Sequence, residues 1–260
     1  MIAGSRPTER PAVTVVSGAG SGIGRAVVAD LLDRGLPVVG IDIDGDTLSE
    51  IAETPNFVPV VGDVVETQTW ASAIEVSRSA FQRPPTQLVS NAAVVLVGTV
   101  LELSDEAWQR TFDVNLMGAV RGIRANLPAM LEARDGRIVT VASVDAFMAE
   151  QLASAYCASK GALLQLTRVV AMDYARRGVR ANCICPGVTD TPLLRRQFDR
   201  ALDPLGVEQG RIERQPIGRL LTPTDIAGAV VFLLSDAASG ITGAMIPVDG
   251  GISTSFDFSG

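Results

Sequence analysis

The residues best suited to take part in a reaction are a tyrosine and a lysine four positions apart, Tyr156 and Lys160. In a helix this spacing places both side chains on one face, roughly 6 Å apart along the axis. A phenol has a pKa of about 10, too high for a base at neutral pH, and a neighbouring ammonium lowers that pKa by favouring the phenolate. The pair is therefore typical of proton transfer, with Tyr156 as general acid or base.

The residue counts support this interpretation. Lys160 is the only lysine among 22 basic residues, and Tyr156 is one of two tyrosines. The alternative is a surface lysine beside an interface tyrosine. The chain contains no histidine, which excludes a Ser-His-Asp hydrolase and most zinc enzymes, and no metal site is expected.

A glycine-rich turn follows the first apolar segment, with the spacing Gly18-x3-Gly22-x-Gly24, and a helical pattern begins directly after it. Glycines permit a tight turn and let a pyrophosphate approach the backbone, while the start of the helix supplies free N–H groups. The spacing differs from the common GxGxxG fingerprint, and a flexible turn is the alternative. Its place between the first strand and the first helix favours dinucleotide binding.

Acidic residues end the next two predicted strands. Asp42 lies 18 residues after Gly24, as expected of a carboxylate that accepts hydrogen bonds from the adenosine ribose hydroxyls. It repels a 2′-phosphate and is followed by Ile43 rather than an arginine, so NAD is favoured over NADP; a solvated turn acid is the alternative. Asp63 ends the third strand, where it either accepts from the adenine amino group or caps the helix near Thr67.

The elements that must position these residues form an alternating pattern of short apolar and longer amphipathic segments. Several short segments are apolar throughout, as strands covered on both faces require. The alternation predicts an α/β fold with a single-domain, doubly wound parallel sheet of seven strands, Rossmann-like, with helices on both faces. The predicted strands are 12–17, 37–42, 57–61, 86–90, 137–142, 179–185 and 244–248, and the predicted helices are 22–34, 45–53, 67–82, 104–134, 154–177 and 222–235.

The sheet also predicts where ligands bind, because in such folds they lie beyond the carboxyl ends of the strands. The irregular stretch at about 188–218 follows the sixth strand and is predicted to be a lid over the domain 12–251. Ser143 ends the fifth strand at the same edge, where its hydroxyl either hydrogen-bonds a substrate carbonyl or caps a turn. The polar ends, 1–11 and 252–260, are predicted to be flexible.

Composition narrows the partners and the compartment. The net charge is −7 and the pI about 4.7, and no basic run is present, which argues against nucleic acid and anionic membranes as partners. The chain start lacks the apolar stretch of a signal peptide, and no segment is long and apolar enough to span a membrane. Cys157, Cys183 and Cys185 are predicted to be buried thiols in a reducing compartment, so a cytoplasmic location is expected.

In this order and at this spacing, the motifs resemble those of the short-chain dehydrogenase/reductase family from about Val13 to Gly251. Two positions depart from the family pattern. The first is Ala93, which stands where the family often has glycine. The second is Asp145, two positions after Ser143, whose carboxylate either accepts from a substrate hydroxyl or lies in solvent. The matching residues are Gly18-x3-Gly22-x-Gly24, Asp63, Asn91-Ala92-Ala93, Asn115, Ser143, Tyr156-x3-Lys160 and Pro186-Gly187-x3-Thr191.

The resemblance implies a catalytic role for four residues. Tyr156 would be the general acid/base, Lys160 would lower its pKa and bind the nicotinamide ribose, and Ser143 would position the substrate oxygen. Asn115 would hold a water that links Lys160 to solvent. Without the resemblance, Asn115 is an ordinary polar cap.

The resemblance also extends the predicted cofactor site. Asn91 would steady the central strand near the cofactor, and is otherwise a polar cap. Val188, through its backbone, and Thr191 would contact the nicotinamide carboxamide. The residues expected to bind NAD are Gly18, Ser21, Gly22, Ile23, Gly24, Asp42, Asp63, Val64, Asn91, Ala92, Tyr156, Lys160, Pro186, Gly187, Val188 and Thr191.

These expectations describe an NAD-dependent alcohol dehydrogenase or ketone reductase. The predicted pocket wall is mainly apolar, so we expect a small-molecule secondary alcohol or ketone of largely apolar character. Besides Asp145, the wall is predicted to contain Val94, Val95, Leu96, Phe147, Leu152, Leu193, Leu194 and Phe198.

Two other functions fit parts of the pattern. A 3-oxoacyl thioester reductase usually takes NADPH, and Asp42 and the acidic pI count against it. A non-catalytic NAD-binding sensor would be expected to lack Tyr156 or Lys160, and this chain has both. The resemblance further implies a homotetramer or homodimer, with helices 104–134 and 154–177 pairing across a two-fold axis.

Overall fold

The computed structural model describes residues 11–199 and 203–254. Most of the two predicted flexible ends lies outside the described residues, and the gap at 200–202 falls within the predicted lid.

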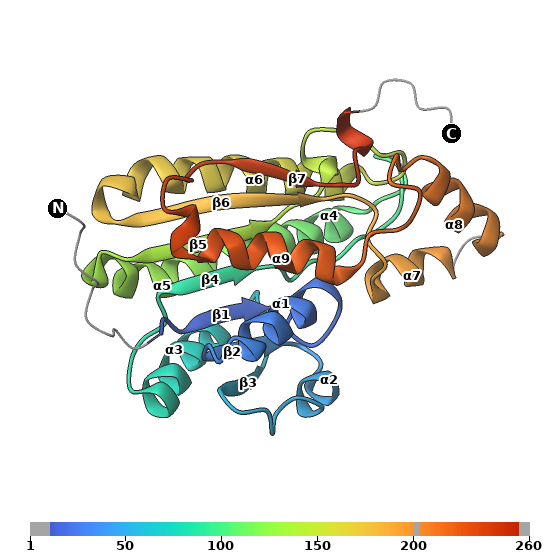
Figure 1. Ribbon diagram of the computed structural model, residues 1–260. Helices are drawn as coiled ribbons and strands as arrows, with labels where there is room; N and C mark the ends of the chain where they lie inside the picture. The colour runs from blue at the N-terminus through green and yellow to red at the C-terminus, as the bar shows by residue number, and fades with distance from the viewer. Residues whose placement is uncertain (1–10, 200–202, 255–260) are drawn as a thin grey trace.

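The described residues form one seven-stranded sheet in the order β3-β2-β1-β4-β5-β6-β7 (Figure 1). Every neighbouring pair is parallel, and the strand order reverses between β1 and β4, where doubly wound sheets bind ligands. The predicted fold class is confirmed, and each strand end lies within two residues of its predicted position. The strands are β1 Thr14–Ser17, β2 Val38–Asp42, β3 Phe57–Val61, β4 Gln87–Ser90, β5 Gly136–Val141, β6 Val179–Pro186 and β7 Met245–Val248.

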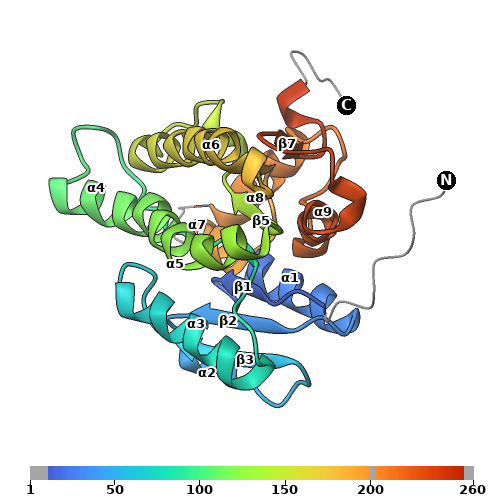
Figure 2. The same cartoon turned by 90° about the vertical axis from the view of Figure 1, so that its left-hand side faces the viewer.

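Helices cover both faces of the sheet, with α1 and α9 on one face and α3, α5 and α6 on the other (Figure 2). Adjacent residues of β1 show why the strands are apolar throughout: Val15 faces one core, Val16 faces the other, and both are fully buried. The helices are α1 Gly22–Asp33, α2 Gly45–Ser49, α3 Thr67–Phe81, α4 Asp105–Phe112, α5 Gly118–Ala133, α6 Ser154–Tyr174, α7 Pro192–Phe198, α8 Pro204–Glu213 and α9 Pro223–Leu234.

The predicted long helix 104–134 is divided in the structure. A π-helical turn, Asp113–Met117, separates α4 from α5. Such turns interrupt the regular hydrogen bonding of a helix and are frequent at functional sites. This one carries the buried side chain of Asn115.

The predicted lid contains two helices, α7 and α8, that the sequence interpretation treated as irregular chain. Each begins with a proline whose preceding residue caps it: Thr191 accepts from the Leu194 N–H, and Asp203 accepts from the Gly206 N–H. Thr-Pro and Asp-Pro pairs are helix-start signals, so the two helices were detectable in the sequence.

The predicted buried thiols are only partly borne out. Cys183 and Cys185 are free and buried on β6, whereas Cys157 is a free thiol that is partly exposed on α6. The difference follows from the helix, since Cys157 lies next to the inward-facing residues of α6 rather than among them.

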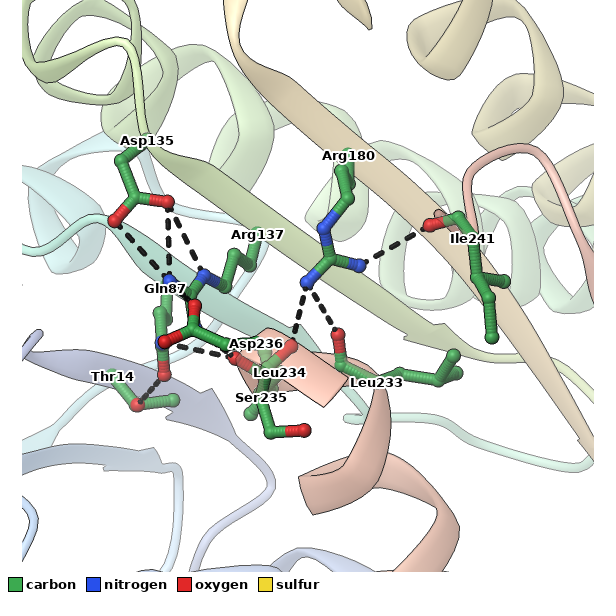
Figure 3. A network of polar contacts seen from close by, with 10 residues as sticks. All are labelled: Thr14, Gln87, Asp135, Arg137, Arg180, Leu233, Leu234, Ser235, Asp236 and Ile241. Atoms are coloured by element: carbon green, nitrogen blue, oxygen red, sulfur yellow. Dashed lines mark hydrogen bonds and ion pairs between the residues drawn. The ribbon is translucent and has the colours of Figure 1, made fainter. Parts of the chain in front are cut away.

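Polar groups at the amino ends of the strands form a network with the C-terminus of α9 (Figure 3). Arg137 on β5 donates to the Leu234 carbonyl at 2.6 Å. Arg180 on β6 donates to the carbonyls of Leu233 and Ser235 at 3.0 and 3.1 Å. The last carbonyls of a helix lack intrahelical partners and carry partial negative charge, so these arginines satisfy and stabilise the end of α9.

Candidate active site

A cavity of about 1420 Å³ lies at the opposite, carboxyl edge of the sheet. It runs from the glycine turn after β1 to the lid helices α7 and α8. Pockets for single drug-sized ligands measure about 300–1,000 Å³, so this one has room for a dinucleotide and a small substrate together. Every predicted cofactor residue lines the cavity except Gly24.

The three glycines of the turn serve different purposes. Gly18 and Gly22 adopt positive φ angles of 68° and 52°, a conformation that L side chains rarely adopt. Gly24 does not face the cavity; a Cβ atom there would lie 1.9 Å from the Gly18 carbonyl oxygen. The prediction that Gly24 faces a ligand is therefore corrected, because its hydrogen side chain lets α1 pack onto the turn.

Asp42 ties this turn to the end of β2. Its Oδ2 accepts from the Gly20 N–H at 2.8 Å, and its Oδ1 accepts from the Asp44 N–H at 3.1 Å. A merely solvated turn acid would not contact the glycine turn. The carboxylate thus stands beside the turn, at the edge of the cavity.

Asp63 has a partner that neither sequence alternative included. Arg110 of α4 donates to its Oδ2 through two guanidinium nitrogens, each at 3.1 Å, and both residues line the cavity. The other oxygen accepts from the Val65 N–H at 3.1 Å. The alternative in which Asp63 caps α3 is not observed, because α3 begins at Thr67 without a side-chain cap.

Two asparagines brace the loop after β4. Asn91 donates to the carbonyls of Ser17 and Gly18 at 3.1 and 3.3 Å, which links β4 to the glycine turn. Asn115 accepts from the Val94 N–H at 2.8 Å and donates to the Val94 carbonyl at 3.0 Å. Asn115 does not line the cavity; its amide also donates to Ser159 Oγ on α6 at 3.0 Å, so it ties the loop at Val94 to that helix.

Tyr156 and Lys160 lie in the first turns of α6, and both line the cavity. The Lys160 Nζ lies 5.5 Å from the centre of the Tyr156 ring and donates to the Val141 carbonyl at 2.8 Å. Lys160 is only 2% exposed. Burial lowers the pKa of its ammonium to about 8.

The direction of the Tyr156 pKa differs from the sequence expectation. Burial raises the pKa of Tyr156 above its ordinary value, the carboxylate of Asp145 adds to the rise, and the nearby Ser143 hydroxyl opposes it. An ammonium lowers the pKa of a phenol only if its effect outweighs desolvation and nearby negative charge.

Ser143 caps a turn, which was one of its two sequence alternatives, and it also lines the cavity. Its Oγ accepts from the Asp145 N–H at 3.2 Å and donates to the Asp145 Oδ2 at 3.0 Å. Asp145 also faces the cavity, where it interacts with Glu150. Glu150 in turn forms an ion pair with Arg211 of α8, which ties the lid to this loop.

The segment after β6 is held close to the cavity by backbone contacts. The Gly187 N–H donates to the Val248 carbonyl at 3.0 Å, and the Val188 carbonyl accepts from the Leu221 N–H at 3.0 Å. Thr191 caps α7, and a Cβ on Gly22 would lie 3.3 Å from its methyl group. The turn therefore leaves a space beside Gly22, which we call the glycine cradle, and any larger residue at that position would fill it.

The substrate end of the cavity is more polar than the sequence predicts. Val94, Val95, Asp145, Leu152, Leu193 and Leu194 line it as expected. Three predicted wall residues do not: Phe198 is buried beneath the lid, with 3% exposure, and Phe147 and Leu96 lie outside the lining. Residues that sequence reasoning missed include Val144, Met148, Glu150, Arg211 and Arg214. Arg211 lies in the last turn of α8 and Arg214 directly follows that helix, a signal that becomes readable only once the helix is recognised.

These features fit a dinucleotide. The cradle at Gly22 offers backbone at the start of a helix, and Asp42 offers a carboxylate near it. Among the residues that the structure describes, no helix is long and apolar enough to cross a membrane. Nor do three or more His, Cys, Asp or Glu side chains gather there as metal ligands would.

The sheet order and the cradle are those of a dinucleotide-binding fold, and Ser143, Tyr156 and Lys160 line the same cavity at its carboxyl edge. Residues 18–253 match the family described as enoyl-(acyl carrier protein) reductase. The chain belongs to the short-chain dehydrogenase/reductase family, as its motifs predict.

Individual relatives include several dehydrogenases. The chain is 38% identical to 2-(S)-hydroxypropyl-CoM dehydrogenase 3 of Xanthobacter autotrophicus, over 92% of this chain and 96% of that one. It is 34% identical to the cyclohexanol dehydrogenase of an Acinetobacter species, over 92% and 93%. The crystal structure of levodione reductase superposes with a TM-score of 0.90, at 27% identity, covering 94% of this chain and 98% of that one. These similarities support an alcohol oxidoreductase.

Proposed function

We propose that this protein is an NAD-dependent dehydrogenase that interconverts a secondary alcohol and its ketone. The observation that carries the proposal is that Ser143, Tyr156 and Lys160 line the same cavity as the glycine cradle and Asp42. When bound, NAD supplies the hydride acceptor for the alcohol carbon.

The protein's own residues supply the proton transfer. Tyr156 removes the hydroxyl proton of the alcohol, or returns a proton to the ketone oxygen in reverse. Ser143 hydrogen-bonds the same oxygen, so that two groups stabilise the charge that develops on it. Lys160 adds positive charge 5.5 Å from the Tyr156 ring.

NAD is favoured over NADP by the charge beside the cradle. Asp42 accepts ribose hydroxyl hydrogen bonds and repels a 2′-phosphate. The neighbouring side chain, Ile43, is uncharged and 63% exposed. Arg110 lines the same cavity but is bound to Asp63, whose charge it offsets.

The substrate is proposed to be a secondary alcohol whose carbon skeleton packs against Val94, Leu152, Leu193 and Leu194. The relatives named above act, by their names, on cyclohexanol and on a hydroxypropyl compound, and both fit this description. The lid arginines make the outer end of the cavity polar, so the far end of the substrate need not be apolar.

The remaining expectations stay proposals. The α4–α5 segment and α6 are the surfaces proposed to pair in a homodimer or homotetramer. The three free cysteines support a reducing compartment, for which the cytoplasm is the expectation.

The proposal is tested by following nicotinamide absorbance with NAD and then NADP, over secondary alcohols, diols and hydroxyacyl thioesters. NAD-linked oxidation of a secondary alcohol is the expected result. Turnover only with NADP and a thioester would favour the 3-oxoacyl thioester reductase. Tight NAD binding without turnover on any of them would favour a sensor.

A further inference from the structure

The hydroxyl of Ser143 has one proton, and that proton is directed at Asp145. Ser143 Oγ donates to the Asp145 Oδ2 at 3.0 Å, while the Asp145 N–H donates back to the same Oγ at 3.2 Å. A hydroxyl whose proton is engaged elsewhere offers a substrate only its lone pairs. In this arrangement Ser143 does not donate to a ketone oxygen, which can only accept hydrogen bonds.

Asp145 can change this arrangement because its proton affinity is unusual. Burial, followed by the negative charge of Glu150, raises the pKa of Asp145 to about 6, while the hydrogen bond from Ser143 and the charge of Arg211 act in the opposite direction. Glu150 belongs to the same loop, and Arg211 reaches the cluster from α8.

Helix α6 contributes the other titratable groups near Asp145. They are Tyr156 and Cys157, whose pKa values its carboxylate raises, and Lys160, whose pKa it raises against the larger lowering by burial. Asp145 therefore lies between an acidic neighbour, a lid arginine and the proton-transfer pair, and it exchanges a proton in the physiological range.

We propose that Asp145 is a positioning residue that sets whether Ser143 donates toward the substrate oxygen, so that ionised Asp145 weakens the binding of a ketone relative to its alcohol and neutral Asp145 restores it. The inference rests on the proposed alcohol–ketone interconversion. Its physical basis is that a carboxylate is a much stronger acceptor than a neutral carboxyl group. Once Asp145 is neutral, the Ser143 proton is free to turn toward a ketone.

The kinetic test compares the KM for a ketone with the KM for its alcohol between about pH 5 and pH 8. In the unmodified protein the ratio of ketone KM to alcohol KM should rise about tenfold as pH rises through 6. A tenfold change is about what the loss of one charge-assisted hydrogen bond produces. Asp145→Ala should hold the ratio low at every pH. Asp145→Asn should fix it at an intermediate value, because an amide oxygen still accepts but does not titrate.

Asp173→Asn is the matched control, since it removes an exposed carboxylate from the far end of α6 and should leave the ratio and its pH dependence unchanged. A ratio that is independent of pH and unaffected by Asp145→Ala, in an enzyme that does turn over alcohols, would overturn the inference and leave the proposed function standing.

A second measurement needs neither cofactor nor turnover. Carbon-13 NMR of labelled aspartate carboxyls should reveal one titration midpoint near pH 6, absent from Asp145→Ala. Ser143→Ala should move that midpoint to higher pH, because the Ser143 hydrogen bond stabilises the carboxylate. A midpoint that Ser143→Ala leaves in place would overturn the coupling of Ser143 and Asp145, even if no alcohol were ever oxidised.

Discussion

Charged side chains at the two edges of the sheet differ in their partners and in their burial. At the amino edge, Arg137 contacts the carboxylates of Asp135 and Asp236 and the carbonyl at the end of α9. At the carboxyl edge, Lys160 is buried and donates to the Val141 carbonyl, and Asp145 lies beside another acid. Arg137 is thus matched by charged partners, whereas Lys160 is desolvated and Asp145 lies near a like charge.

The difference separates stability from reactivity. A charge surrounded by hydrogen-bond partners keeps its ordinary protonation and stabilises the fold. A charge that is desolvated or set beside a like charge has a shifted pKa and is ready to exchange a proton. The following changes are expected to affect one edge without the other, and they are ordered by expected size.

Tyr156→Phe should give the largest loss, lowering kcat/KM by about 10²- to 10⁴-fold, because it removes the proton-transferring oxygen and little else. The free energy of unfolding should change by less than about 1 kcal/mol. Steady-state kinetics and denaturant unfolding measure the two quantities. A variant that keeps more than about a tenth of the activity would show that Tyr156 is not the general acid/base.

Lys160→Met should lower kcat/KM by about 10²-fold and yet raise stability at neutral pH by about 1–3 kcal/mol, because it removes a buried ammonium. The pKa of Lys160 is about 8 in the folded protein and 10.5 ordinarily. Below pH 8 the buried ammonium is charged and destabilises the folded state. Unmodified protein should gain stability as pH rises from 8 to 10.5, and the advantage of the variant should shrink across that window. A variant less stable than the unmodified protein at pH 7 would contradict this account.

Asp42→Ala should raise the KM for NAD about tenfold and narrow the preference for NAD over NADP, since it removes a charged hydrogen-bond acceptor. Asp44→Ala is the matched control: it removes the neighbouring carboxylate, which caps α2 and does not line the cavity. Initial rates at varied NAD and NADP measure both. Equal effects of the two variants would mean that Asp42 acts only through local structure.

Arg180→Met should have the smallest effect on activity and act only on stability. It leaves the carbonyls of Leu233, Ser235 and Ile241 without this donor, at a cost of about 1–3 kcal/mol in the free energy of unfolding. The control Arg168→Met removes an exposed arginine and should cost less than about 0.5 kcal/mol. A tenfold fall in kcat/KM in Arg180→Met would contradict the account in which the amino edge affects only stability.

The sequence was most informative where local chemistry is the cause. Runs such as 37–42 must be strands because no other element buries a continuous apolar segment of that length on both faces. The spacing of Tyr156 and Lys160 follows from helical periodicity and requires no knowledge of the rest of the fold.

It failed where the outcome depended on contacts between distant segments. Nothing near Asp63 in the chain indicates Arg110, which reaches it from a helix more than 40 residues away. Phe198 was expected in the pocket because it is apolar, but the packing of α7 turned it into the core. The pocket lining from α8 was missed for the same reason.

By itself, the sequence determined the seven strands, the glycine turn and the spacing of the proposed proton-transfer pair, Tyr156 and Lys160, because each depends on residue type and local spacing. Only the tertiary structure decided the electrostatic surroundings of that pair. Burial and Asp145 raise the pKa of Tyr156, and burial lowers that of Lys160. These shifts depend on desolvation and on charges brought close by folding, and neither quantity exists until the chain has packed.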